Sequence, residues 1–158
     1  MYRFWVREKG EHELTDVVDP TNARTPVYAR TLAEIKEAGL CPFCPENFRW
    51  HPHEITFHEG GWRLTPNVHP YENTKHHFLI IPDRHYTGIW DIASLDWQVV
   101  RDLALKAGSR FGFKGGGLML RYGDTKLSGA TVVHLHFHLI VPKVDEAGSA
   151  LPVYFPIG

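Results

Sequence analysis

One stretch of the sequence decides the fold: Val132-Val133-His134-Leu135-His136-Phe137-His138-Leu139-Ile140-Val141. Its alternation of histidine with apolar residues predicts a β-strand, in which successive side chains point to opposite faces of the sheet. One face then carries His134, His136 and His138, and the other carries Val133, Leu135, Phe137 and Leu139. We expect the apolar face to bury against the core, with the three imidazoles roughly 6.5–7 Å apart on the opposite side.

Three aligned histidines are compatible with three roles. They can bind a metal, act as a nucleophile with acid support, or lie as ordinary polar side chains on a solvated face. The regular alternation beside a strongly apolar face argues against the third role. A three-histidine zinc site needs only modest convergence of the side chains, because Zn–N bonds are about 2.0–2.1 Å long. A neutral imidazole is also a good nucleophile near pH 7, and a covalent phosphoramidate can divide one phosphoryl substitution into two steps.

The sequence before this stretch predicts further strands. Apolar residues alternate with polar ones on both sides of a turn at Glu59-Gly60-Gly61, which predicts a hairpin. A polar loop over residues 67–75 leads to the apolar run 78–81, which predicts a buried strand that ends at Pro82. Another short strand is expected at residues 118–120.

Two helices are expected between these strands. The first covers residues 31–39, with a capping box formed by Thr31 and Glu34 and with Gly39 at its C-terminal end. The second covers residues 95–111, begins after Ser94 and presents one apolar stripe to the sheet. The glycine-rich segment 114–117 ends this helix instead of opening one, so we expect a connector and not a phosphate-binding loop.

Length and element order predict the domain organisation. The 158 residues are 43% hydrophobic and 22% charged, as expected for one globular domain. We divide the chain into an N-terminal arm, residues 1–30, which is irregular with at most one short strand, and a domain over residues 31–158. The order hairpin, strand, helix, strand, strand predicts an α+β domain with a mainly antiparallel sheet.

Composition also limits the expected partners. A formal net charge of −1 argues against duplex nucleic acid as the main partner and favours a small molecule. No run approaches the about 20 apolar residues that cross a membrane, and the first residues lack the apolar stretch of a signal peptide. We therefore expect a cytoplasmic protein without a nucleic-acid or membrane partner.

The two cysteines of the chain, Cys41 and Cys44, form a Cys-Pro-Phe-Cys pair. In a reducing compartment such a pair indicates metal or redox chemistry. A thioredoxin-like redox pair would open a helix after a strand, whereas this pair follows a predicted helix and is flanked by prolines. The pair therefore predicts half of a zinc site, and the nearest candidates for the other two ligands are His51 and His53.

Two motifs together resemble the histidine triad (HIT) family. Residues 134–140 alternate histidine with apolar residues and end in two apolar positions, as the triad signature does. The segment His77-Phe78-Leu79-Ile80-Ile81-Pro82-Asp83-Arg84-His85 resembles the family's preceding strand, with a histidine at its start and another just past its end. The motifs have the family's order and spacing, and the resemblance covers residues 41–142. It implies a single histidine triad-like domain with a mainly antiparallel sheet and one long helix packed on it.

The resemblance implies a nucleotide hydrolase or nucleotidyltransferase that acts at the α-phosphate of a small nucleotide. Its substrate would be of the dinucleoside polyphosphate or nucleoside phosphoramidate type. His136 is the implied nucleophile and forms a nucleotidyl-histidine intermediate, while His138 hydrogen-bonds phosphate or leaving-group oxygens and His77 supports the triad from the neighbouring strand. A homodimer paired through a helix and an edge strand is also implied. The alternative is a non-catalytic, zinc-stabilised nucleotide-binding protein.

Two positions depart from the family's pattern. Many members carry glutamine shortly before the triad, where this chain has Ala130, followed by Thr131, whose hydroxyl can donate to a leaving-group oxygen. The acidic residue that often holds the ribose is replaced by His69, and Asn67 can hydrogen-bond the hydroxyls in its place. The sequence therefore leaves the nucleoside open.

The resemblance also implies a different set of zinc ligands. Zinc-bearing branches of the family, and the related hexose-phosphate uridylyltransferases, combine such cysteines with two histidines that correspond to His85 and His134. We favour the set Cys41, Cys44, His85 and His134 over the local pair, because it ties the N-terminal loop to the triad strand in a closed, structural zinc site. The uridylyltransferases themselves fit poorly, since they have longer chains and carry proline where Leu135 lies.

Overall fold

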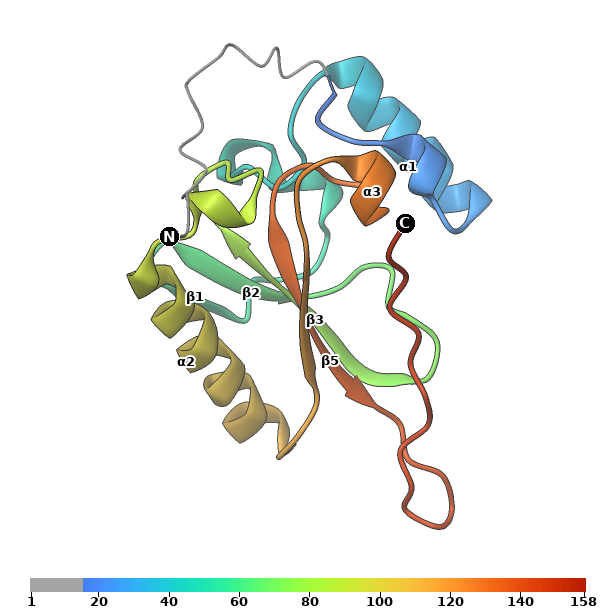
Figure 1. Cartoon of the computed structure of the whole chain (residues 1–158), viewed down its shortest axis with the longest axis vertical. Helices are drawn as coiled ribbons and strands as arrows, with labels where there is room; N and C mark the ends of the chain where they lie inside the picture. The colour runs from blue at the N-terminus through green and yellow to red at the C-terminus, as the bar shows by residue number, and fades with distance from the viewer. Residues whose placement is uncertain (1–15) are drawn as a thin grey trace, which may run out of the picture.

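The computed structural model describes residues 16–158, which form one antiparallel sheet with helices on both faces (Figure 1). The five strands lie in the order β1-β2-β3-β5-β4. The elements, in chain order, are α1 (Pro26–Ala38), β1 (Phe57–Glu59), β2 (Trp62–Pro66), β3 (Thr74–Pro82), α2 (Ser94–Phe111), β4 (Gly117–Arg121), α3 (Thr125–Ser128) and β5 (His136–Pro142), with 3-10 turns at Pro20–Asn22, Pro45–Trp50 and Ile89–Asp91. The predicted α+β class and antiparallel sheet are confirmed.

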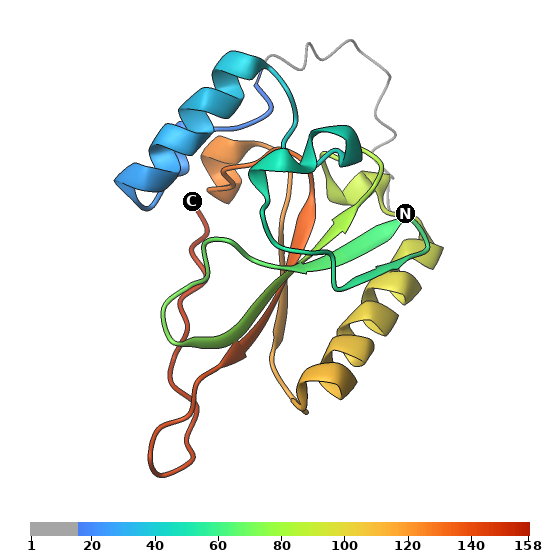
Figure 2. The ribbon, with the colours of Figure 1, turned by 180° about the vertical axis from the view of Figure 1, so that it is seen from behind.

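The sheet separates two apolar cores, and β3 contributes to both. Phe78 and Ile80 face α2, where Val100, Leu103 and Ala107 cover them. Leu79 and Ile81 face the opposite side, in a cluster that includes Leu32 and Ile35 of α1. Figures 1 and 2 show the two helices on opposite sides of the sheet. Burial on both faces explains why this strand is a continuous apolar run, as the sequence predicted.

The predicted hairpin and the second helix are confirmed, and their ends have local causes. Gly60 and Gly61 have φ of 54° and 75°, the left-handed conformation that a tight two-residue hairpin loop requires. The second helix, α2, begins at Ser94, and the Asp96 carboxylate accepts from the Ala93 amide at 2.8 Å. It ends at Phe111 and is capped by Gly112, which has φ 72°. Gly115 and Gly116 belong to the connector, as predicted, whereas Gly117 already begins β4.

The first helix begins five residues earlier than residue 31, and our predicted cap was wrong. Thr25 caps α1, accepting from the Tyr28 amide at 3.1 Å, and Pro26 occupies the first turn, where its missing N–H costs nothing. Thr31 instead lies inside the helix and donates to the Val27 carbonyl. The C-terminal end at Gly39 is confirmed, with φ 65°. Residue 30 therefore lies within α1, and residues 1–15 of the predicted arm lie outside the described part.

The triad strand also starts later than predicted, at His136 instead of Val132. Before β5, the chain pairs with the N-terminal segment: Val132 bridges Val18, and the Val133 amide donates to the Val17 carbonyl at 3.0 Å. His134 thus precedes the regular strand. Within residues 16–158 no helix combines the length and apolar character needed to span a membrane.

Candidate active site and metal centre

The central strands β3 and β5 lie side by side (Figure 1). Their register brings His77, His136 and His138 together on one face of the sheet. The His77 Nε2 and His138 Nδ1 atoms are 2.9 Å apart. The rings of His136 and His138 have centroids 4.9 Å apart. All three side chains are buried. The structure therefore gathers His136 and His138 with His77, the histidine predicted to support the triad from the neighbouring strand.

The hydrogen bonds around these rings determine where their protons lie. The backbone amide of Tyr71 donates to His77 Nδ1 at 3.1 Å, so a neutral His77 carries its proton on Nε2 and donates it toward His138 Nδ1. A neutral His138 then carries its own proton on Nε2. The triad thus presents a donor N–H at His138.

His136 has the opposite arrangement. Its Nδ1–H donates to the backbone carbonyl of His134 at 2.8 Å, which leaves the lone pair of Nε2 available. The Phe43 ring contacts this imidazole edge-on, with centroids 5.0 Å apart. Burial lowers the pKa of His136 to about 4, and the pKa of His138 lies well below its ordinary value for the same reason. Both rings are therefore neutral near pH 7, as a nucleophilic imidazole must be.

Of the two other predicted substrate-binding residues, Asn67 lies beside His77 and Thr131 lies against Tyr28. The Asn67 amide nitrogen is 3.1 Å from His77 Nε2, and its carbonyl oxygen accepts from the His69 amide. The Thr131 hydroxyl is 2.8 Å from the Tyr28 hydroxyl, which belongs to α1. Tyr28 therefore holds the threonine hydroxyl in place.

The predicted distant ligands form a compact cluster. One ligand atom from each of Cys41, Cys44, His85 and His134 lies within 4.8 Å of the others, so the group could hold a metal ion. The Sγ–Nδ1 distances are 3.3 Å for Cys41–His134, 3.4 Å for Cys44–His85 and 3.7 Å for Cys44–His134. Zn–S bonds of about 2.3 Å and Zn–N bonds of about 2.0–2.1 Å at tetrahedral angles place such atoms about 3.6 Å apart. The spacing therefore fits a tetrahedral metal.

Protonation supports the same fit. His134 Nε2–H donates to the Pro82 carbonyl at 2.9 Å, so its Nδ1 lone pair points at the sulfurs, as a metal ligand requires. Burial raises the pKa of Cys41 to about 12, so this thiol is neutral unless a cation holds it as a thiolate.

The local alternative for the metal ligands is not part of this cluster. His51 Nε2 is 2.9 Å from the Thr65 hydroxyl, and its ring stacks on Phe48 with centroids 4.8 Å apart. His53 is exposed. Proximity along the chain was therefore a poorer guide than the resemblance, which identified the histidines that the fold brings to the cysteines.

Three residues at the triad face were not identified from the sequence. Tyr71 stacks on His138, and Phe155 meets the same ring edge-on. Arg121 ends β4 and donates to the Gly129 carbonyl at 3.0 Å. The period-two continuation of the strand at residues 118–120 could have drawn attention to the arginine that follows it. Phe155 has no comparable local signal.

Comparison with known proteins is consistent with this site. The HIT domain family model matches residues 61–145, more than half of the chain. The chain therefore belongs to the HIT family. No curated protein matches it.

Solved structures extend the comparison. A HIT family hydrolase from Clostridium thermocellum is 29% identical, with 69% of this chain and 95% of that chain covered and a TM-score of 0.50. A Zn-bound histidine triad family protein from Mycobacterium smegmatis is 18% identical, with coverage of 69% and 78% and a TM-score of 0.52. A hypothetical protein from Leishmania major is 24% identical, with coverage of 75% and 83% and a TM-score of 0.55. The last two show the fold alone.

Proposed function

We propose that this protein is a nucleotide hydrolase or nucleotidyltransferase that acts at the α-phosphate of a small nucleotide. One observation carries the proposal: His136 has its Nε2 lone pair available next to the donor N–H of His138. Membership of the HIT family and the similarity to a HIT family hydrolase support it.

In the proposed first step, His136 Nε2 attacks the α-phosphorus. A P–N bond forms as the bond from phosphorus to the leaving group breaks, and His138 Nε2–H hydrogen-bonds the leaving atom as negative charge develops on it. In the second step, the oxygen of water or another acceptor attacks phosphorus, the P–N bond breaks, His136 returns to its neutral form, and the acceptor's proton passes to solvent. His77 fixes the tautomer of His138, while Thr131 and Asn67 contact the leaving group and the ribose.

The test separates this proposal from a non-catalytic nucleotide-binding protein, which the absence of a glutamine amide at Ala130 favours. The purified protein is incubated with a dinucleoside polyphosphate and with a nucleoside phosphoramidate, and released nucleoside monophosphate is measured. We expect release from at least one substrate, with no release by His136→Ala. Binding of nucleotide without any release would support the alternative function.

We also propose that the metal cluster binds a structural zinc ion through Cys41, Cys44, His85 and His134. Four protein ligands leave no position for water, so zinc supplies folding free energy here and no chemistry. The cluster ties the loop after α1 to the residues that precede β5, and the His134 carbonyl is also the acceptor that orients His136. The zinc-bound relative supports a zinc site in this fold.

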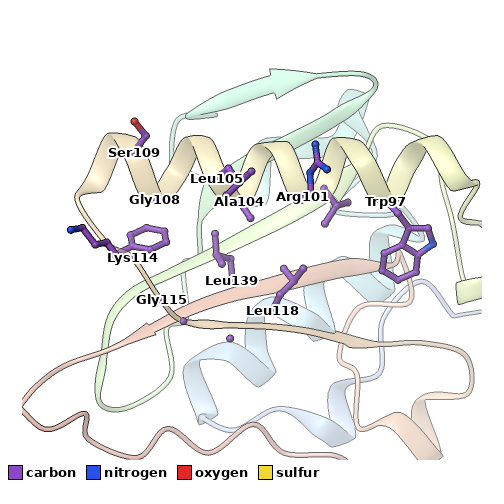
Figure 3. A pocket seen from close by; sticks show the side chains of 14 residues that line it. Trp97, Arg101, Ala104, Leu105, Gly108, Ser109, Lys114, Gly115, Leu118 and Leu139 are labelled. Carbon is purple, nitrogen blue, oxygen red and sulfur yellow. The ribbon is translucent and has the colours of Figure 1, made fainter.

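A homodimer is the proposed assembly, through α2 and the edge strand β4 (Figure 3). Between them lies a hollow of about 460 Å³, lined mainly by apolar groups. Leu105, Leu118 and Trp97 beside it are 64%, 44% and 43% exposed. Exposed apolar surface at an open sheet edge is typical of a protein interface. Light scattering should give the mass of a dimer for the wild type and a lower mass for Leu118→Glu. The cytoplasmic location stays a prediction.

A further inference from the structure

Two arginines are buried among residues 16–158, and they differ in their partners. Arg63 is 2% exposed, and its Nε lies 2.8 Å from the Asp83 carboxylate. Arg121 is 7% exposed, and no carboxylate among residues 16–158 forms an ion pair with it. A buried charge without a counter-charge is unfavourable unless another group compensates it. Arg121 therefore lacks the anion that Arg63 has.

The partners of Arg121 are neutral and incomplete. One terminal nitrogen donates to the Gly129 carbonyl and the other to the Tyr71 hydroxyl. Its Nε is buried without a hydrogen-bond partner among the described residues. The guanidinium also lies over the Phe155 ring, 4.5 Å from its centroid. A planar guanidinium with an unused donor is suited to bind phosphate oxygens.

The register of the sheet places Arg121 at the triad. Arg121 pairs with His136 across β4 and β5, and directly opposed residues of an antiparallel pair project to the same face, with Cβ atoms about 4.5–5.5 Å apart. Its two aromatic neighbours, Tyr71 and Phe155, both contact His138. The pKa of His77 is lowered mainly by burial and further by the nearby positive charges, those of Arg24 and Arg121 among them. The arginine therefore lies close to the reacting histidines.

Phe155 reaches this position from the C-terminal tail, defined here as residues 151–158. Figures 1 and 2 show the tail running back along the sheet and ending near α3. It is held by few polar contacts: the Leu151 amide donates to the Lys143 carbonyl, and the Asn73 side chain donates to the Pro152 carbonyl. The ring of Phe155 lies 5.1 Å from that of His138. The Phe155 ring thus contacts both the Arg121 guanidinium and the His138 imidazole.

We infer that Arg121 binds the phosphate oxygens of the nucleotide at the triad, and that Phe155 covers this position until the phosphate displaces it. The inference rests on the proposed function and identifies Arg121 as a positively charged residue that binds the substrate at that site. A guanidinium at the phosphorus stabilises the negative charge on the equatorial oxygens during attack by His136.

Equilibrium binding tests the inference without turnover. Affinities of the four common nucleoside 5′-monophosphates and of the parent nucleosides are measured by calorimetry for the wild type, Arg121→Gln and Arg121→Lys. Loss of a charged hydrogen-bond donor should weaken monophosphate binding about 10- to 100-fold. Nucleoside binding should not change, and Arg121→Lys should give an intermediate affinity. Arg110→Gln removes an exposed arginine at the end of α2 and should bind like the wild type.

The outcomes are distinct. A wild type that binds no monophosphate contradicts the proposed function itself. If the wild type binds monophosphate, two results for Arg121→Gln would overturn the role of Arg121. One is monophosphate binding as tight as that of the wild type, and the other is an equal loss of affinity for nucleoside and monophosphate. Phe155→Ala keeps the arginine and provides a second test if the arginine variants do not fold. This variant should bind inorganic phosphate severalfold more tightly than the wild type. Unchanged or weaker phosphate binding by Phe155→Ala overturns the covering role.

Discussion

His77 donates from Nε2 to Nδ1 of His138 across 2.9 Å, and this hydrogen bond orders the protons of the triad. The Tyr71 amide determines the tautomer of His77, and His77 in turn determines that of His138. The Tyr71 amide therefore determines, through His77, that His138 Nε2–H is the donor that faces the substrate. His77 is a positioning residue in this arrangement, because it acts through His138.

Replacement of His77 tests this relay. His77→Ala should lower kcat by about 10- to 100-fold, the usual effect of losing a group that orients a functional histidine. His77→Gln should recover part of the rate, because its amide N–H can donate to His138 Nδ1. Both variants are assayed for released nucleoside monophosphate. Equal rates for the alanine and glutamine variants would contradict a role in tautomer control.

His136→Ala should remove turnover by several orders of magnitude while the protein stays folded. The expected loss is about 10³-fold or more in kcat, because the nucleophile itself is lost. Circular dichroism and the Tm check the fold, and His53→Ala, at an exposed histidine outside both sites, is the matched control. Near-wild-type activity of a clean His136→Ala preparation would remove His136 from the nucleophile role.

The parts of the site that a periodic sequence pattern marks could be predicted from the sequence. The alternation of His136 and His138 with apolar residues identified both the strand and the triad face, because period two is a local property of the backbone. The start of α1 was missed because Thr31-x-x-Glu34 and Thr25-Pro26 are both acceptable helix starts, and packing of the segment against the sheet decides between them.

Arg121 was missed for a different physical reason. One charged residue at the end of a short strand has no pattern of its own, and its meaning comes from the pairing that places it opposite His136. His85 and His134 are likewise far from the cysteines in sequence. These two histidines reach the cysteines because β3 and β5 are neighbouring strands. The same pairing brings the Pro82 carbonyl to the ring of His134.

Zinc should be present at about one atom per chain in protein purified without chelator. Cys41→Ser should release it and lower the Tm more than it lowers the kcat of the remaining folded protein, because a structural metal contributes folding free energy. His85→Ala and His134→Ala should also release zinc, and His134→Ala should reduce kcat as well, since the residue precedes the triad strand.

Elemental analysis of these variants measures the zinc. His51→Ala and His53→Ala are the controls and should keep it, because neither side chain reaches the cysteine cluster. Full zinc content in both His85→Ala and His134→Ala would show that the cluster is not the metal site.

The stability of the protein in acid should depend measurably on His51. Burial, with a smaller effect of the neighbouring His53, lowers the pKa of His51 from 6.5 to about 4. The other charged or titratable side chains that act on it, Arg63 and His69, lower it in the same direction. Because the folded-state pKa is the lower one, the unfolded chain binds more protons between these values. The contribution of neutral His51 is therefore complete above pH 6.5 and is lost as the pH falls toward 4.

His51→Gln removes this titration and keeps a side chain that can hydrogen-bond the Thr65 hydroxyl. Between pH 7 and pH 4.5, the free energy of unfolding of the wild type should fall by about 2 kcal/mol more than that of the variant. Urea unfolding at a series of pH values measures both, and comparison at each pH cancels the loss of zinc common to the two proteins. His53→Gln, at the exposed neighbour, should keep most of the wild-type pH dependence, because burial is the larger cause of the lowered His51 pKa. An identical pH dependence for His51→Gln and wild type would mean that His51 is not held neutral in the fold.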